Sequence, residues 1–310
     1  MPYLRLSLAA LAFLMLAACA GAASAGLREY PFRLESEQKG DGHEIVAHND
    51  GPAAITVYVS LADQENIASD RKWPLTAVVP PKQSLVLGRL FRATARGAYR
   101  FSFKYRHQFG DVAAVHDPSA AYRLPFEDGH TFLISQSYGG AITTHTTADS
   151  AHAVDIVMPE RTPIVAARAG VVIDIENFHV RGGKEQDLLD KANSVTILHD
   201  DGTMARYVHL NAGQYTWIGQ EVQAGTHIGY SGNTGYSSGP HLHFVVVRAQ
   251  QNADGSIAYQ SEPIRFYAHN PPLQFAPLQG MLVTSNYDAP GVMPPLLPIG
   301  RDRLPAISPR

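Results

Sequence analysis

The stretch that most constrains this chain is Gly-Pro-His-Leu-His-Phe at residues 239–244, which runs directly into three valines. Successive side chains of a β-strand point to opposite faces, so residues two apart share a face. His241 and His243 therefore project together, whereas Leu242 and Phe244 point into an apolar layer. Two imidazoles side by side suit a metal centre, with one as ligand and the other as proton carrier. The alternative interpretation is a pair of surface histidines on an edge strand.

Length and composition narrow the class of protein. A chain of 310 residues has room for two domains that each bury a core. Lys and Arg number 25 against 28 Asp and Glu, and no basic run offers a phosphate-binding surface, so we expect no nucleic-acid partner. The single cysteine, Cys19, lies near the N-terminus. The folded part therefore has no disulfide or thiolate ligand, and His and carboxylate groups must hold any metal.

Residues 1–25 have the pattern of a signal peptide. Arg5 supplies a positive charge, and residues 6–18 form an apolar run that is short for a membrane span. Ala-Ser-Ala at residues 23–25 is a cleavage signal, whereas Leu-Ala-Ala-Cys at residues 16–19 resembles a bacterial lipobox. We therefore expect an exported protein of the periplasm or cell envelope, either released by cleavage or tethered to a membrane through an acylated Cys19.

The next segment, residues 27–128, predicts an accessory domain made of β-strands. Short alternating patterns are separated by turn signals such as Asn-Asp-Gly-Pro, without helical periodicity. The clearest strand patterns lie at residues 44–48, 54–60, 84–87 and 99–105. Short strands at this spacing favour an immunoglobulin-like β-sandwich. The role of this domain is left open, because fold analogy does not assign function.

Residues 130–268 predict a second β domain. Residues 194–210 form a hairpin pattern with an Asp-Gly turn, and residues 186–190 carry a short helical pattern. A glycine-rich run at residues 219–239 precedes the histidine pair, as expected for turns around a site. Residues 269–310 are rich in proline and predict an extended or disordered tail. The chain is therefore expected to be mainly β.

The histidines and one aspartate of this second domain suggest a catalytic metal centre. Such a zinc site needs three nitrogen or oxygen ligands with the fourth position left to water, together with groups that transfer protons. One histidine upstream of Asp155, Asp155 itself and one member of the histidine pair provide three ligands. His209 and the other member of the pair remain for proton transfer. Spacing alone does not exclude another divalent ion on these donors.

Four ordered motifs within residues 130–250 resemble a known family. They are Val-Asp-Ile-Val-Met-Pro at residues 154–159, Thr-Pro-Ile-Val-Ala-Ala at residues 162–167 with the strand that follows, Tyr-Val-His-Leu at residues 207–210, and the run from residue 229 to residue 244. The family is the lysostaphin-type (LytM-like) zinc endopeptidases, which cut peptide cross-links in bacterial peptidoglycan. The resemblance implies an antiparallel-sheet peptidase domain that binds Zn2+.

The resemblance also implies roles for individual residues. Asp155 and His243 match zinc ligands, and His209 and His241 match the catalytic pair that orients water and stabilises the oxyanion. The usual first ligand lies four residues before the aspartate, where this chain has Ala151. His145 and His152 are the two replacements, and we favour His145. On a strand, His152 would face away from Asp155, whereas His145 matches a subgroup with a longer loop.

The expected function is that of an exported zinc-dependent endopeptidase that hydrolyses peptide cross-links in peptidoglycan, with peptidoglycan stem peptides as its partners. One alternative is a non-catalytic cell-wall-binding or amidase-activating protein on the same fold, which the loss of a ligand would mark. Another is a sugar-binding or structural β-protein with surface histidines, which predicts no bound metal. The bond cleaved is not predicted by these motifs.

Overall fold

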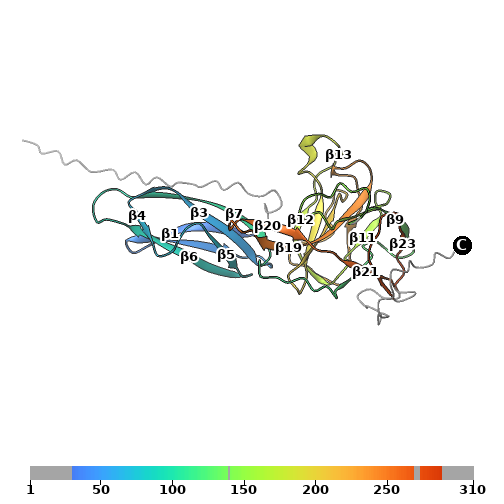
Figure 1. Cartoon of the computed structure of the whole chain (residues 1–310), viewed down its shortest axis with the longest axis horizontal. Coiled ribbons are helices and arrows are strands. Elements are labelled where there is room, and N and C mark those ends of the chain that lie inside the picture. Colours follow the sequence, from blue (N-terminus) through green and yellow to red (C-terminus); the bar gives the residue numbers. More distant parts are fainter. Residues whose placement is uncertain (1–29, 139, 269–272, 288–310) are drawn as a thin grey trace, which may run out of the picture.

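The computed structural model describes residues 30–138, 140–268 and 273–287, which are built almost entirely from β-strands (Figure 1). In these ranges the helical element is a single 3-10 turn, η2 (Gln186–Leu188), inside the predicted short helix. The prediction of a mainly β chain is confirmed. The predicted signal peptide and Cys19 lie outside the described residues. None of the helices in the described ranges is long and apolar enough to cross a membrane.

Two sheets make up the N-terminal domain. Seven strands divide between a sheet of four, β1 (Phe32–Lys39), β2 (Gly42–Asn49), β6 (Gln83–Arg92) and β4 (Ile67–Ser69), and a sheet of three, β5 (Leu75–Val79), β3 (Ile55–Glu65) and β7 (Arg100–Phe109). Alternate apolar residues of both sheets share one core, including Ile45 and Leu87 from the first sheet and Val57 and Val59 from the second. This arrangement is a β-sandwich, and its immunoglobulin-like topology stays a prediction.

The second domain is organised around one large antiparallel sheet. In spatial order its strands are β16 (Glu221–Val222), β12 (Gly170–Glu176), β14 (Ser194–Leu198), β15 (Met204–Val208), β19 (His241–Gln251), β10 (Val154–Val157), β9 (Thr131–Gln136) and β23 (Leu282–Thr284), and β20 (Ile257–Ser261) also pairs with β19. The predicted hairpin is the β14–β15 pair, and Gly202 in its turn has a φ of 80°, which favours glycine. The long strand β19 therefore lies inside the sheet.

Three small sheets complete this domain. They are β11 (Pro163–Val165) with β17 (His227–Tyr230), β13 (Gly182–Gly183) with β18 (Gly235–Tyr236), and β22 (Leu273–Phe275) with β21 (Arg265–Ala268) and β8 (Ala121–Arg123). Side chains of the first and third of these sheets join those of the main sheet in one buried core, in which Tyr207, Phe244 and Phe266 are fully buried. This core underlies the strand that carries the histidine pair.

Residues 273–287 belong to the folded domain, although the sequence predicted a tail from residue 269. Strand β22 pairs with β21, and β23 pairs with β9 at the edge of the main sheet. Beyond β23, the Tyr287 hydroxyl donates a hydrogen bond to the Tyr267 carbonyl, 2.5 Å away, and the Arg123 guanidinium lies 4.1 Å from the Tyr287 ring centre. The prolines nearby do not interrupt either strand, and an edge position accommodates a short strand beside them.

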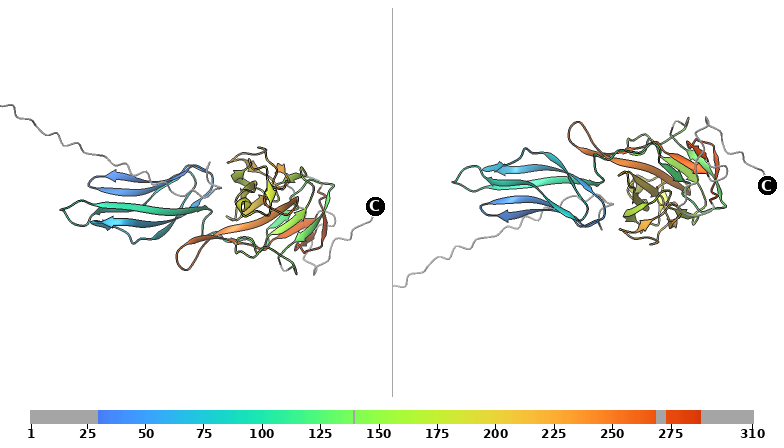
Figure 2. Two further views of the ribbon diagram at one scale, coloured as in Figure 1. Left: turned by 90° about the horizontal axis from the view of Figure 1, so that it is seen from above. Right: turned by 90° about the horizontal axis from the view of Figure 1, so that it is seen from below.

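The two domains share a buried contact. Tyr30, Ala53 and Phe109 of the sandwich pack in one apolar cluster with Met204 and Val245 of the second domain. In Figure 2 the β19–β20 hairpin reaches from the second domain to the end of the sandwich. Three hydrogen bonds hold it there: Thr76 Oγ1 donates to the Gly255 carbonyl at 2.9 Å, Gln108 Nε2 to the Ala258 carbonyl at 2.8 Å, and the Phe109 amide to Tyr259 Oη at 2.9 Å. The hairpin is thus a structural link between the domains.

Candidate active site

The first residues of strand β19 present the histidine pair as the alternation predicts. Leu242 and Phe244 are fully buried in the core, whereas His241 and His243 are partly exposed on the opposite face of the sheet. Strand pairing therefore determines which residues can meet the two imidazoles. His243 faces Asp155 of β10 on one side and Val208 of β15 on the other. Residues paired in this way share a face.

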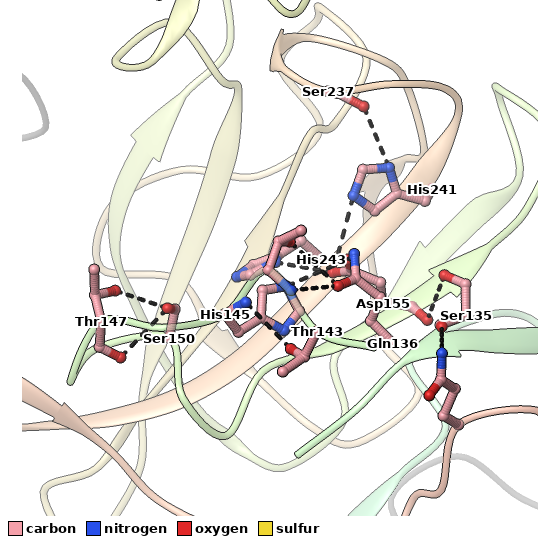
Figure 3. Close-up of polar contacts among 12 residues, drawn as sticks. Ser135, Gln136, Thr143, His145, Thr147, Ser150, Asp155, Ser237, His241 and His243 are labelled. Atoms are coloured by element: carbon pink, nitrogen blue, oxygen red, sulfur yellow. Dashed lines mark hydrogen bonds and ion pairs between the residues drawn. The ribbon is translucent and has the colours of Figure 1, made fainter. Parts of the chain in front are cut away.

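Asp155 is the centre of the cluster (Figure 3). Its carboxylate is almost fully buried, with Oδ1 2.9 Å from His243 Nδ1 and 3.9 Å from His241 Nε2. The other oxygen, Oδ2, lies 3.3 Å from His145 Nε2 and accepts a hydrogen bond from Gln136 Nε2 at 2.8 Å. The carboxylate thus contacts three of the histidines that the sequence singled out.

His145 reaches Asp155 from the loop between β9 and β10. Its side chain is only 7% exposed, and its ring lies 4.8 Å from the His243 ring, centre to centre. Gln136 stabilises this loop, because its Oε1 accepts a hydrogen bond from the Thr144 amide at 2.7 Å while its Nε2 binds Asp155. The same side chain therefore holds both the loop and the carboxylate.

His152, the other candidate for the first ligand, is directed elsewhere. Its Nδ1 lies 2.8 Å from the Ser261 carbonyl and its ring packs edge-on against Tyr138, with centres 5.4 Å apart. Among the described residues, the group of His and carboxylate atoms within 4.8 Å of one another at this site comprises His145, Asp155 and His243. His152 is not part of that group.

His209 lies directly after β15, beside the residue that pairs with His243. Its ring centre is 4.6 Å from that of His241 and 6.0 Å from that of His243. Its backbone φ is 64°, in the left-handed region that residues other than glycine seldom occupy. Such conformations cost free energy and persist where the surroundings determine them.

Hydrogen bonds to carbonyl oxygens determine the tautomers of the two remaining histidines. His209 Nδ1 lies 2.6 Å from the Thr234 carbonyl, and His241 Nδ1 lies 2.8 Å from the Gly239 carbonyl. Since a carbonyl oxygen only accepts, each Nδ1 carries the proton and each Nε2 carries a lone pair in the neutral ring. The Nε2 atom of His241 points towards Asp155 (Figure 3).

The electrostatics of the cluster favour an ionised Asp155 carboxylate and a neutral His209. Burial would raise the pKa of Asp155, but hydrogen bonds and charge from His145 and His243 outweigh it and hold that pKa well below its usual range. Burial, reinforced by charge from His241 and His243, lowers the pKa of His209 to about 4. At neutral pH His209 is therefore uncharged and able to accept a proton.

The donor set suits a zinc ion. His145 Nε2, His243 Nδ1 and an Asp155 oxygen are two nitrogens and one oxygen, the ligands that catalytic zinc sites use with one position left open. The two nitrogens lie 3.3 and 2.9 Å from the Asp155 oxygens, so the three side chains converge on one place. His209 and His241 flank this set and leave Nε2 available. The arrangement can hold a metal and transfer protons beside it.

Sequence patterns missed several residues that support the cluster. Gln136 donates a hydrogen bond to Asp155. The carbonyl oxygens of Thr234 and Gly239 accept hydrogen bonds from His209 and His241. The Asn193 carbonyl accepts one from the amide of Leu210, the residue after His209. The contacts of Thr234 and Gly239 to the histidines run through backbone carbonyls, which every residue type possesses. The one available signal was the glycine-rich composition of residues 219–239, which indicated turns around a site.

Comparison with known proteins relates the segment that holds most of the cluster to a peptidase family. The family described as "Peptidase family M23" matches residues 149–255, which contain Asp155, His209, His241 and His243. Among relatives, the peptidoglycan DD-endopeptidase ShyA of Vibrio cholerae is 38% identical over 93 residues, covering 30% of this chain and 19% of that protein. Lysostaphin of Staphylococcus simulans is 29% identical over 133 residues, covering 43% and 24%.

Solved structures include the catalytic domain of the antimicrobial peptidase lysostaphin from Staphylococcus simulans. It is 28% identical, covers 39% of this chain and 79% of that chain, and has a TM-score of 0.26. The chain spans less than half the length of the first relatives that it matches in sequence. Residues 149–255, with the aspartate and three of the histidines of the cluster, therefore form a domain of peptidase family M23.

Proposed function

We propose that this protein is an exported zinc-dependent endopeptidase that hydrolyses peptide cross-links in bacterial peptidoglycan. The observation that carries the proposal is the joint contact of His145 and His243 with the buried Asp155 carboxylate, beside His209 and His241. A relative named as a peptidoglycan DD-endopeptidase supports the substrate class. Export follows from the predicted signal peptide and agrees with a substrate in the cell envelope.

In this proposal His145, Asp155 and His243 hold the zinc ion. When bound, zinc supplies a Lewis acid for a carbonyl group and lowers the pKa of water towards neutrality. The protein contributes a carboxylate that is ionised over the whole physiological pH range, because its neighbours keep its pKa low. It also contributes the imidazoles of His209, which is neutral at physiological pH, and of His241. Each binds a carbonyl oxygen through Nδ1 and leaves Nε2 available.

His209 and His241 are the proposed proton carriers. A neutral imidazole accepts a proton from the attacking water through Nε2, and the imidazolium formed then donates that proton to the leaving amine or hydrogen-bonds the oxyanion. The 4.6 Å between the two ring centres lets both act on one substrate carbonyl. The hydrogen bonds to Thr234 and Gly239 keep each Nδ1 occupied and each Nε2 directed away from these carbonyls.

The proposal is tested by measuring zinc content and turnover together. Zinc per chain is quantified in the purified protein, and purified peptidoglycan is digested and analysed for new peptide fragments. His145→Ala and His152→Ala serve as a matched pair, because both histidines precede Asp155 but contact different partners. We expect one zinc per chain and fragment release, with both lost in His145→Ala and both retained in His152→Ala.

Other outcomes separate the alternatives. Loss of zinc in His152→Ala alone would reassign the first ligand to that residue. Zinc bound without any cleavage would favour the non-catalytic cell-wall-binding or amidase-activating protein. A wild-type protein without zinc would overturn the metallopeptidase assignment and favour a β-protein with surface histidines.

A further inference from the structure

We propose that Thr234 and Asn193 are positioning residues that hold His209 in its left-handed conformation and direct its ring for catalysis. This inference rests on the proposed function, because it assigns His209 a part in hydrolysis. Neither residue belongs to the cluster around Asp155, and neither contacts the candidate metal ligands through any described hydrogen bond. Both act on His209 through the backbone of Leu210 and of Thr234.

The peptide groups of Leu210 are held on both sides. The Leu210 amide donates to the Asn193 carbonyl at 3.1 Å. The Leu210 carbonyl accepts from Thr234 Oγ1 at 2.9 Å and from Asn193 Nδ2 at 3.2 Å. With the residue after His209 fixed at both its amide and its carbonyl, the chain has little freedom to relax the φ of 64° at His209.

Thr234 connects this backbone contact to the imidazole. Its hydroxyl also accepts a hydrogen bond from the Asn193 amide at 3.0 Å, so the side chain is held between two backbone groups. Its own carbonyl accepts the proton of His209 Nδ1 at 2.6 Å. A single residue thereby fixes the backbone beside His209 and the tautomer of its ring.

Burial makes these hydrogen bonds hard to replace. Asn193 is fully buried and Thr234 is 5% exposed. Asn193 has further bonds to the loop around His179, whose carbonyl accepts from Nδ2 at 2.8 Å and whose amide donates to Oδ1 at 2.9 Å. Without water to substitute for a lost partner, the Thr234 hydroxyl determines the geometry at His209.

The test compares Thr234→Val, which removes the hydroxyl and keeps the shape, with Thr234→Ser, which keeps the hydroxyl. Thr56→Val is the matched control, because Thr56 is fully buried and its hydroxyl donates to the Gly110 carbonyl, 2.7 Å away in the sandwich. The readouts are kcat and KM on cross-linked muropeptides from purified peptidoglycan, zinc per chain, and nitrogen NMR signals of the His209 ring.

For Thr234→Val we expect kcat to fall on the order of 10- to 100-fold, as a misplaced catalytic group costs, with KM and zinc content unchanged. The nitrogen signals of the His209 ring should shift from their wild-type positions, because the Thr234 carbonyl that accepts from Nδ1 is no longer anchored through the hydroxyl. Thr234→Ser and Thr56→Val should keep wild-type kcat. If Thr234→Val does not fold, Thr234→Cys, which retains a weak donor, should give an intermediate kcat.

Equal kcat in Thr234→Val and Thr234→Ser would overturn the inference, and so would loss of zinc in Thr234→Val, because the effect would then run through the metal ligands. The NMR readout does not depend on turnover. A wild-type protein that cleaves nothing but shows His209 protonated at Nδ1, with the ring signals shifted in Thr234→Val, would retain the positioning role while contradicting the proposed function. An unchanged ring signal in that variant would contradict the positioning role itself.

Discussion

Asp155 Oδ1 and His243 Nδ1 lie 2.9 Å apart on residues that face each other across β10 and β19. The sheet register alone brings these two groups together, because paired residues of antiparallel strands project from the same face. The two residues are 88 positions apart in sequence, and the chain between them is folded back by β12, β14 and β15, which occupy the other side of β19. The cluster is thus a product of strand order.

Replacing Asp155 with Asn should abolish zinc binding. The amide keeps the size of the carboxylate but lacks its charge, and loss of outer partners of a metal ligand already weakens binding by about 10- to 100-fold. We expect a larger loss here, measured by competition with a fluorescent zinc chelator. The control is Asp149→Asn, which should bind zinc normally. Asp149 lies in the loop that carries His145, and its carboxylate accepts a hydrogen bond from the Thr147 hydroxyl. Stoichiometric zinc in Asp155→Asn would exclude that residue as a ligand.

Truncating Leu242 should destabilise the sheet beneath the histidine pair. Leu242 is fully buried in the core, and Leu→Ala at such positions costs about 2–5 kcal/mol of unfolding free energy. Urea unfolding followed by circular dichroism measures the change. Leu189→Ala is the matched control, because Leu189 is 66% exposed and its truncation should change the free energy of unfolding little. Equal effects of the two substitutions would contradict the packing described for β19.

His199 should make the protein less stable in acid. Burial lowers its pKa from 6.5 to about 4, and its Nδ1 lies 2.8 Å from the Ala169 carbonyl. The unfolded chain binds the proton more readily, so the contribution is complete above pH 6.5 and is lost as the pH falls towards 4. A shift of this size corresponds to about 3 kcal/mol.

The measurement is the free energy of unfolding as a function of pH in wild type and in His199→Gln. Burial also lowers the pKa values of His107 and His209, so the difference between the two proteins isolates His199. That difference should change between pH 6.5 and 4 and be constant above this window. A difference that stays constant through the window would mean that His199 is accessible to water and titrates normally.

Removing the Tyr259 hydroxyl should weaken the contact between the domains. Tyr259 Oη accepts the Phe109 amide proton at 2.9 Å, and in Tyr259→Phe this buried amide loses its partner, at a cost of about 1–3 kcal/mol. Chemical denaturation should report the loss, while the ring remains stacked against Arg206, whose guanidinium is 4.1 Å from its centre. Tyr236→Phe, at a residue 47% exposed, should leave the unfolding free energy unchanged.

The sequence predicted the β class from local patterns, and it predicted the members of the cluster from motifs that resemble the lysostaphin-type family. Alternation around His241 and His243 indicates a strand with one polar and one buried face, and the structure has that arrangement. The predicted β14–β15 hairpin forms with its Asp-Gly turn. The preference for His145 over His152 followed from the subgroup with a longer loop, and in the structure His145 lies beside Asp155 whereas His152 contacts Ser261.

Other features could not be predicted because they depend on contacts between distant segments. Strands β22 and β23 are short and lie in proline-rich sequence, so their pairing with β21 and β9 left little local signal. The backbone hydrogen bonds of Asn193 and Thr234 involve residue types that are also common in turns. The apolar cluster between the domains draws on residues as far apart as Tyr30 and Val247.

The strand β19 also sets a scale for the whole molecule. His241 is its first residue and Gln251 its last, and at about 3.3 Å per residue its 11 residues extend roughly 35 Å from the histidine cluster to the hairpin against the sandwich. The distance between the histidine cluster and the sandwich is therefore set by the length of one continuous strand, whose ladder of backbone hydrogen bonds resists bending.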